Sequence, residues 1–151
     1  MDPEIYTVLR LLAAVGAGVA LGYPRELTEK PIGMRTLALV SLGAAMVTLA
    51  ATGQFDFVKA PDAASRVLQG IVQGLMVGVG FIGAGVILRD TSTSRVHGLT
   101  TATTVWIAAA LGIACGLGAW LIALTGLLLA LMVLVVLKRF ERKVSPEMEK
   151  H

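Results

Sequence analysis

Charge is scarce in this chain of 151 residues: Asp, Glu, Lys and Arg together make up 15% of it, against about 25% in a typical soluble domain. Apolar residues make up 56%, and the mean hydropathy is +0.79. A soluble protein of this length could not cover so much apolar surface with so few charges. The composition therefore excludes an ordinary soluble domain and indicates an integral membrane protein.

Cysteine and histidine are almost absent. Cys115 is the only cysteine, so no disulfide can form within the chain and no cysteine cluster can hold a metal. The two histidines are His97 and the C-terminal His151, too few for a histidine site. Nothing resembles a nucleophile–base pair or a phosphate loop, so we expect no enzyme and no catalytic residue. No cofactor is expected, although Mg²⁺ stays possible at a site that the sequence leaves unknown.

Long apolar runs are what the sequence does contain. Asp2 and Glu4 precede the first run, whereas a signal peptide starts with basic residues, so we expect a retained membrane helix that ends at Tyr23–Pro24. The predicted fold is an all-α integral membrane protein with a transmembrane domain at 1–137 and a short basic cytoplasmic tail at 138–151. Its five predicted spans are residues 5–22, 36–52, 67–88, 99–115 and 120–137.

Basic residues are unevenly spread over the connections between these spans. The first connection, the third connection and the C-terminus share one side, which carries most of the Lys and Arg. The other side has only Lys59 and Arg66, with Arg10 near the outer end of the first span. Because short cytoplasmic loops are rich in Lys and Arg, we expect the N-terminus outside and the C-terminus inside. Such clusters attract anionic lipid rather than nucleic acid.

A glycine motif stands in the third span, where Gly78, Gly80 and Gly83 spell the G-x-G-x-x-G of a dinucleotide-binding loop. That loop needs a preceding strand and an acidic residue about 20 residues later. Here the run before it is apolar, and Thr100 and Thr101 stand where the acid belongs. The dinucleotide reading is therefore rejected.

A helical reading gives the same glycines a packing role. At 100° per residue, four glycines of the third span fall within about 80° of one another, and Gly80 and Gly83 point elsewhere. Glycine lets transmembrane helices approach closely, so we expect helix packing here, with the alternative that the GFIGAG segment is a broken helix. The predicted packing residues are Gly70, Gly74, Gly78, Gly80, Gly83 and Gly85.

Three blocks along the chain, GMRT, GFIGAG and GLTTA, together resemble the membrane domain of the MgtC/SapB family. The resemblance covers roughly residues 8–118. It implies a bacterial inner-membrane protein linked to low magnesium, virulence or acid stress, and many members are labelled magnesium transporters. It also implies, for some members, regulation through binding other membrane proteins.

The chain departs from that family's pattern in its first loop and third span. Where the family usually has G-x-E-R, this chain has Gly22-Tyr-Pro24-Arg25, so a proline replaces the acid, with Glu26 close by. The third span is also about one helical turn longer than usual, which leaves its glycine face nearly unrotated.

Two polar groups are candidate sites. Acids and bases at the cytoplasmic end predict either a solvated rim or a cluster that gates or docks a partner, in which Arg35 and Arg89 pair with carboxylates. Its members are Arg25, Glu26, Arg35, Arg89, Asp90, Arg95 and His97. Within the spans, amides and hydroxyls predict interhelical hydrogen bonds or a small polar path. These are Gln69, Gln73, Thr100, Thr101 and Thr104.

Two functions compete on these grounds. Spans without Asp or Glu, together with abundant small residues, favour a regulator that binds other inner-membrane proteins and forms a homo-oligomer. The alternative is an ion pathway, with Mg²⁺ as first candidate. Mg²⁺ is usually held by carboxylates and retained waters, so spans without carboxylates argue against a dehydrated site.

Overall fold

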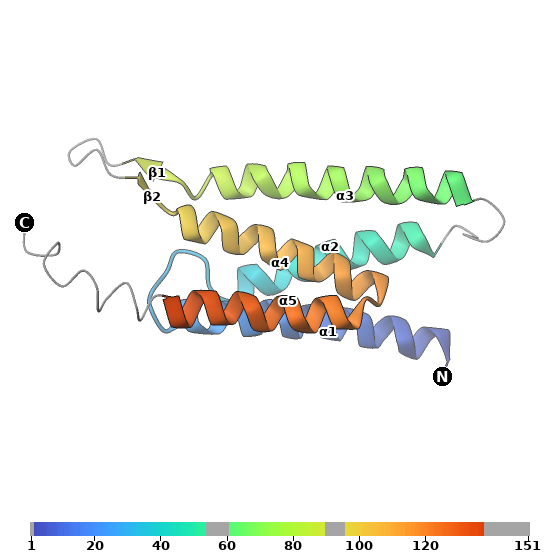
Figure 1. Cartoon of the computed structure of the whole chain (residues 1–151), viewed down its shortest axis with the longest axis horizontal. Coiled ribbons are helices and arrows are strands. Elements are labelled where there is room, and N and C mark those ends of the chain that lie inside the picture. The colour runs from blue at the N-terminus through green and yellow to red at the C-terminus, as the bar shows by residue number, and fades with distance from the viewer. Residues whose placement is uncertain (1, 54–60, 90–95, 138–151) are drawn as a thin grey trace, which may run out of the picture.

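The computed structural model describes residues 2–53, 61–89 and 96–137 (Figure 1). Within them lie five helices long and apolar enough to cross a membrane, which confirms the predicted fold class. The expected tail at 138–151 lies outside the described residues. The helices are α1 (Pro3–Glu26), α2 (Met34–Thr52), α3 (Pro61–Ala84), α4 (Leu99–Leu117) and α5 (Trp120–Met132), which continues as the π-helix η1 (Val133–Leu137).

The first helix is longer than predicted at both ends. It starts at Pro3, where the missing N–H costs nothing because the first helical N–H groups have no partner within the helix. It continues through Pro24 to Glu26, although a proline removes one hydrogen bond and crowds the preceding turn. The loss is confined to one bond, the one that would reach the carbonyl of Ala20, and the helix ends two residues later. The expected stop at Tyr23–Pro24 was therefore wrong, and Arg25 is a helical residue.

The third helix is continuous through the glycine motif. It runs from Pro61 to Ala84, with Asp62 in its first turn, so the predicted span at 67–88 ends four residues early. The helix is unbroken through most of GFIGAG and ends just before its final glycine, Gly85. Beyond Ala84 the chain turns, with Gly85 N donating to the carbonyl of Phe81 at 3.1 Å. It then enters the strand β1 (Leu88–Arg89), which pairs antiparallel with β2 (Val96–His97).

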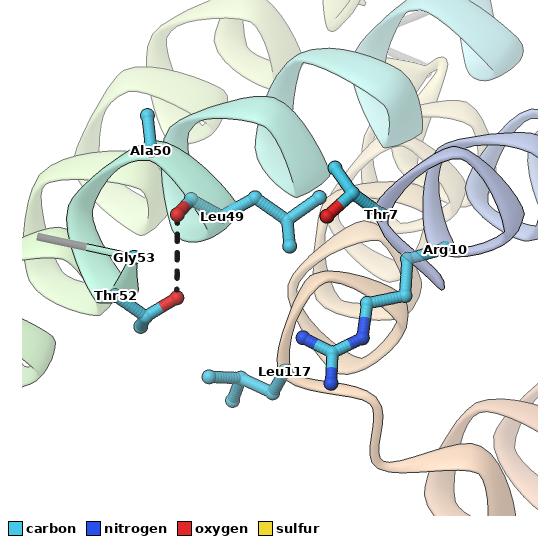
Figure 2. A pocket seen from close by; sticks show the side chains of 7 residues that line it. All are labelled: Thr7, Arg10, Leu49, Ala50, Thr52, Gly53 and Leu117. Carbon is cyan, nitrogen blue, oxygen red and sulfur yellow. Dashed lines mark hydrogen bonds between the residues drawn. The ribbon is translucent and has the colours of Figure 1, made fainter. Parts of the chain in front are cut away.

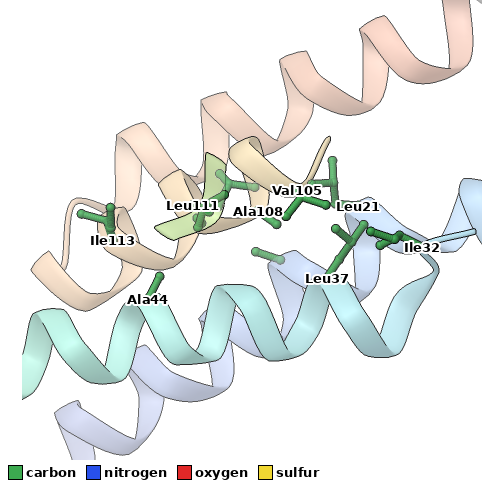
Figure 3. Close-up of a cluster of buried hydrophobic side chains, with 11 residues drawn as sticks. Leu21, Ile32, Leu37, Ala44, Val105, Ala108, Leu111 and Ile113 are labelled. Atoms are coloured by element: carbon green, nitrogen blue, oxygen red, sulfur yellow. The ribbon is translucent and has the colours of Figure 1, made fainter. Parts of the chain in front are cut away.

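Helix α4 is the centre of the bundle. It contacts α1, α2, α3 and α5, and more than half of its apolar window is buried, whereas few residues of α3 and α5 are. Figure 1 shows α3 along one edge of the bundle, with α4 next to it. The core lies where α1, α2 and α4 meet, around the fully buried side chains of Leu21, Leu37 and Val105 (Figure 3).

Glycines bring the backbones of these three inner helices into direct contact. A methyl group built on Gly22 of α1 would lie 2.5 Å from Cα of Met34, and one on Gly18 would lie 2.5 Å from the carbonyl oxygen of Leu37. On α4, a methyl group on Gly112 would overlap the carbonyl oxygen of Ser41. Lipid supplies no hydrophobic force between helices, so van der Waals contact at such short range holds them together.

The glycines of α3 do not share this role among the described residues: even at Gly83, which faces α4, an added methyl group would make only an ordinary van der Waals contact. A methyl group on Gly83 would lie 3.5 Å from Cβ of Ala102 in α4. Gly85 is near only carbonyls of its own segment. A methyl group on the remaining predicted packing residues would meet no atom within 4 Å, and these are Gly70, Gly74, Gly78 and Gly80. These four glycines lie on the outward face of α3, because the face that packs against the bundle is formed by Ala64, Val79 and Gly83.

Gly112→Ala is expected to destabilise the protein, because the added methyl group must push α4 away from α2. Overpacking of this kind costs about 1–3 kcal/mol. The matched control is Gly16→Ala, since Gly16 is exposed on α1 and a methyl group there meets nothing within 4 Å. Helix propensity alone favours alanine by about 1 kcal/mol, so the control should melt at or above the wild-type temperature in detergent. Equal melting of both variants would contradict the close approach of α2 and α4.

Candidate functional site: a buried arginine between three segments

Arg25 is a buried charged side chain, the only one among the residues whose burial the structure describes. It follows Leu21 and Gly22 on the inward face of α1, at the i+4 and i+3 positions. Only 5% of its surface is exposed, although it stands next to the helix end. Long charged residues near the ends of membrane helices normally extend toward water. Arg25 instead turns into the protein.

Three hydrogen bonds hold its guanidinium group. Nε donates to the carbonyl of Ile32 at 3.1 Å, in the connection between α1 and α2. Nη1 donates to Oγ1 of Thr104 at 3.2 Å, and Nη2 donates to Oγ1 of Thr101 at 2.5 Å. The Thr104 hydroxyl in turn donates to the carbonyl of Thr100 at 2.6 Å. One side chain therefore joins α1, the α1–α2 connection and α4.

The acceptors that the structure describes for Arg25 are neutral oxygens. A buried charge is costly unless it is well hydrogen-bonded, and here three donors are used. The carbonyl end of α1 favours a cation, whereas the amino end of α4 disfavours one, so the two helix dipoles largely cancel. The positive charge therefore remains a source of positive potential inside the bundle.

Glu26, the next residue, organises the same connection from outside. Its Oε2 accepts a hydrogen bond from the backbone N–H of Met34 at 3.0 Å. Met34 is the first residue of α2, and the preceding Gly33 has no side chain with which to cap that helix. The Glu26 carboxylate therefore takes the place of a capping side chain and complements the positive end of α2.

The residues predicted as a polar path separate into the threonines of α4 and the glutamines of α3. Thr101 and Thr104 are each 3% exposed and bind Arg25. Thr100 is exposed and contributes its carbonyl. Gln69 and Gln73 are exposed on α3 and point away from the bundle. The five residues do not line one continuous path within the chain.

The residues predicted as a cytoplasmic cluster are only partly described. Arg25 binds inward and Glu26 caps α2, while Arg35 is exposed. Leu88 pairs with His97 and Arg89 with Val96 in the short β-ladder, which brings the backbones of Arg89 and His97 together. Asp90 and Arg95 lie outside the described residues. Pairing of Arg35 and Arg89 with carboxylates stays a prediction.

Sequence reasoning missed the link between Arg25 and the two threonines, and it missed the Ile32 carbonyl. A usable signal was present, because the buried face Gly18, Gly22 and Arg25 continues at helical spacing past Pro24. In the described ranges, no group of three or more His, Cys, Asp or Glu side chains is placed to hold a metal ion.

Fold and site together define the class: a multi-pass helical membrane protein whose inner helices are joined by glycine contacts and a buried arginine. The chain belongs to the MgtC family, whose sequence profile matches residues 11–143. This confirms the resemblance drawn from the GMRT, GFIGAG and GLTTA blocks.

Individual relatives agree with that membership. Protein SrpB of Synechococcus elongatus is 42% identical over 142 residues, which cover 88% of this chain and 75% of SrpB. Protein MgtC of Salmonella typhimurium is 36% identical over 91% of this chain and 55% of its own length. Protein SapB of Bacillus subtilis is 36% identical over 97% and 62%, respectively. The chain thus spans little more than half of MgtC. No solved structure matches it.

Arg25→Lys is expected to destabilise the protein although it keeps the charge. Lysine presents a single ammonium group and cannot reproduce the fork that reaches Ile32, Thr101 and Thr104. Hydrogen bonds to charged groups contribute about 1.5–3 kcal/mol each, so a clear drop in melting temperature in detergent should follow. Thr101→Val should weaken the wild type but add little in the lysine background.

The control for this substitution is Arg35→Lys, because Arg35 is exposed at the start of α2. Exposed substitutions usually change stability by less than about 0.5 kcal/mol. If Arg25→Lys melted like Arg35→Lys, the hydrogen bonds to the threonines would not be holding the helices.

Proposed function

We propose that the protein is a regulator in the bacterial inner membrane that binds a transmembrane helix of another integral membrane protein on the outward face of α3. The observation that carries this proposal is the pair of exposed amides at Gln69 and Gln73, in the middle of an apolar helix. A side-chain amide has no hydrogen-bond partner among lipid tails. A second polar helix against this face would supply one.

The shape of the same face also suits a helix. Gly70, Gly74 and Gly78 have free space above their Cα atoms and fall on one side of α3. Next to them stand Val77 and Phe81, which are 76% and 84% exposed. Small residues beside large apolar ones form a groove into which another helix backbone can fit closely. A partner that offers a polar side chain at the level of Gln73 would satisfy both shape and hydrogen bonding.

The distribution of basic residues supports the orientation proposed for this regulator, with the N-terminus outside and the C-terminus in the cytoplasm. In that orientation the Arg25 end of the bundle faces the cytoplasm. The α3 face runs the length of the membrane and is accessible to partners from within the bilayer.

An ion pathway is the competing proposal, suggested by the polar side chains inside the bundle. Arg25 argues against it, because its guanidinium occupies the interior polar position between Thr101 and Thr104. A fixed positive charge at a constriction excludes cations. Mg²⁺ would have to pass it without a compensating carboxylate among the described acceptors of Arg25.

Photo-crosslinking in cells can test the docking face. A benzophenone amino acid at Val77 should form an adduct that maps to a transmembrane segment of another protein, one with a polar side chain facing Gln73. Gly74→Leu should abolish the adduct, since its side chain fills the groove, and should also abolish growth complementation on limiting magnesium. A probe at Leu121, which is 76% exposed on α5, is the matched control and should give no specific adduct.

Two results would overturn the proposal. An adduct with the mass of two copies of this chain would show self-association on α3 in place of a different partner. Full complementation by both Gly74→Leu and Gln73→Leu would show that this face contributes nothing to function.

A further inference from the structure

A pocket of about 490 Å³ lies at the start of α1, whereas Arg25 stands in the last turn of that helix. Figure 2 shows the side chains that line the pocket. It is formed where the start of α1 meets the ends of α2 and α4. Its polar lining is Thr7, Arg10 and Thr52, and its apolar lining includes Leu49, Ala50 and Leu117. A volume of about 300–1,000 Å³ is typical of sites for small molecules.

Arg10 brings the positive charge to this pocket. Its Nη1 donates to the carbonyl of Gly116 at 3.0 Å, at the last turn of α4. Gly118, which ends α4 with a φ of +73°, lets the guanidinium lie against the backbone there. The Nε atom is buried and has no hydrogen-bond partner among the residues that the structure describes. Of the five N–H donors of an arginine, one is assigned to Gly116 and the Nε–H is closed off from the pocket, so the remaining Nη N–H groups are the ones that can reach an anion.

Aromatic residues indicate the level of the membrane at which the pocket lies. The Arg10 guanidinium lies 4.3 Å from the ring centre of Tyr6. Tyr6 accepts a hydrogen bond from Nε1 of Trp120 at 3.0 Å, and the two rings are nearly perpendicular at 79°. Tyrosine and tryptophan gather at the level of lipid headgroups. Arg10 itself stands about 10 Å from the start of α1, at about 1.5 Å per residue.

We infer that this pocket binds a phosphate-bearing anion at the membrane surface, with Arg10 as its cationic anchor. Arginine suits phosphate because its fork can donate two parallel hydrogen bonds. A bare phosphate would leave most of the 490 Å³ empty. A phospholipid headgroup fills it better, since its glycerol can lie against Leu49 and Leu117 while the phosphate reaches Arg10.

A carboxylate of the chain itself is the competing occupant. Gly53 lines the pocket, and Asp56 follows it three positions later in a segment outside the described residues. The experiment therefore has to separate an internal Arg10–Asp56 pair from an external anion.

The test is a titration of the purified protein in detergent, with thermal unfolding as readout. Phosphatidylglycerol should stabilise the wild type more than phosphatidylcholine, and Arg10→Gln should weaken the apparent affinity for phosphatidylglycerol by about tenfold. Arg66→Gln is the matched control, because Arg66 is exposed near the start of α3 at the same end of the bundle and lies outside the pocket. It should bind like the wild type. A parallel titration with inorganic phosphate identifies the ligand. If phosphate alone stabilised the protein as much as phosphatidylglycerol, the ligand of the pocket would be a free anion and not a lipid headgroup.

A second variant keeps the inference testable if Arg10→Gln unfolds. Ala50→Trp fills the pocket from its exposed edge without removing the Arg10 bond to Gly116, and it should also lose stabilisation by phosphatidylglycerol. Equal stabilisation of the wild type, Arg10→Gln and Ala50→Trp would overturn the site. An Asp56→Asn variant gives a second result that would overturn the site. If it were as unstable without lipid as Arg10→Gln, and if it bound phosphatidylglycerol while the wild type did not, Arg10 would be paired with Asp56 inside the chain.

Discussion

The close approach of three helix backbones is the constraint on which the rest of the structure depends. Gly22 lets α1 touch the start of α2, and Gly112 lets α4 touch its middle. In a bilayer, helices gain little from hiding apolar side chains from lipid, so this contact surface must be formed by shape. Once α1, α2 and α4 share it, α3 and α5 can pack only around the outside, and much of their surface remains exposed.

The same contact places Arg25. Because Gly22 removes the space between α1 and the start of α2, the residue one turn further along faces Ile32 and the first turns of α4. A side chain that would otherwise extend to the membrane surface is held by Thr101 and Thr104. The inner three-helix unit is thus joined at one end by a charge and along its length by glycine, while the outer helices α3 and α5 have few buried residues.

The number and approximate position of the helices could be predicted from the sequence, because apolar runs of this length have few alternatives. The close contacts at Gly18 and Gly22 lie at a helical spacing of small residues, although Gly16 of the same helix is exposed. The faces that pack could not be predicted. The α3 glycines are arranged like a packing stripe, yet Gly74 and Gly78 point away from the chain, because the neighbours of a helix are decided by the whole bundle. Arg25 could not be joined to Thr101, 76 positions away, without knowing that α1 continues through Pro24.

The central claim is that the interior of the bundle is closed by packing and by the Arg25 charge, so that the protein acts through contacts on its surface. Magnesium entry into liposomes that contain the purified protein and an internal Mg²⁺-sensitive dye tests this most directly. The account predicts the same Mg²⁺ entry rate as in protein-free liposomes at every Mg²⁺ concentration tested. An entry rate that rises with the amount of protein and saturates with Mg²⁺ would contradict it.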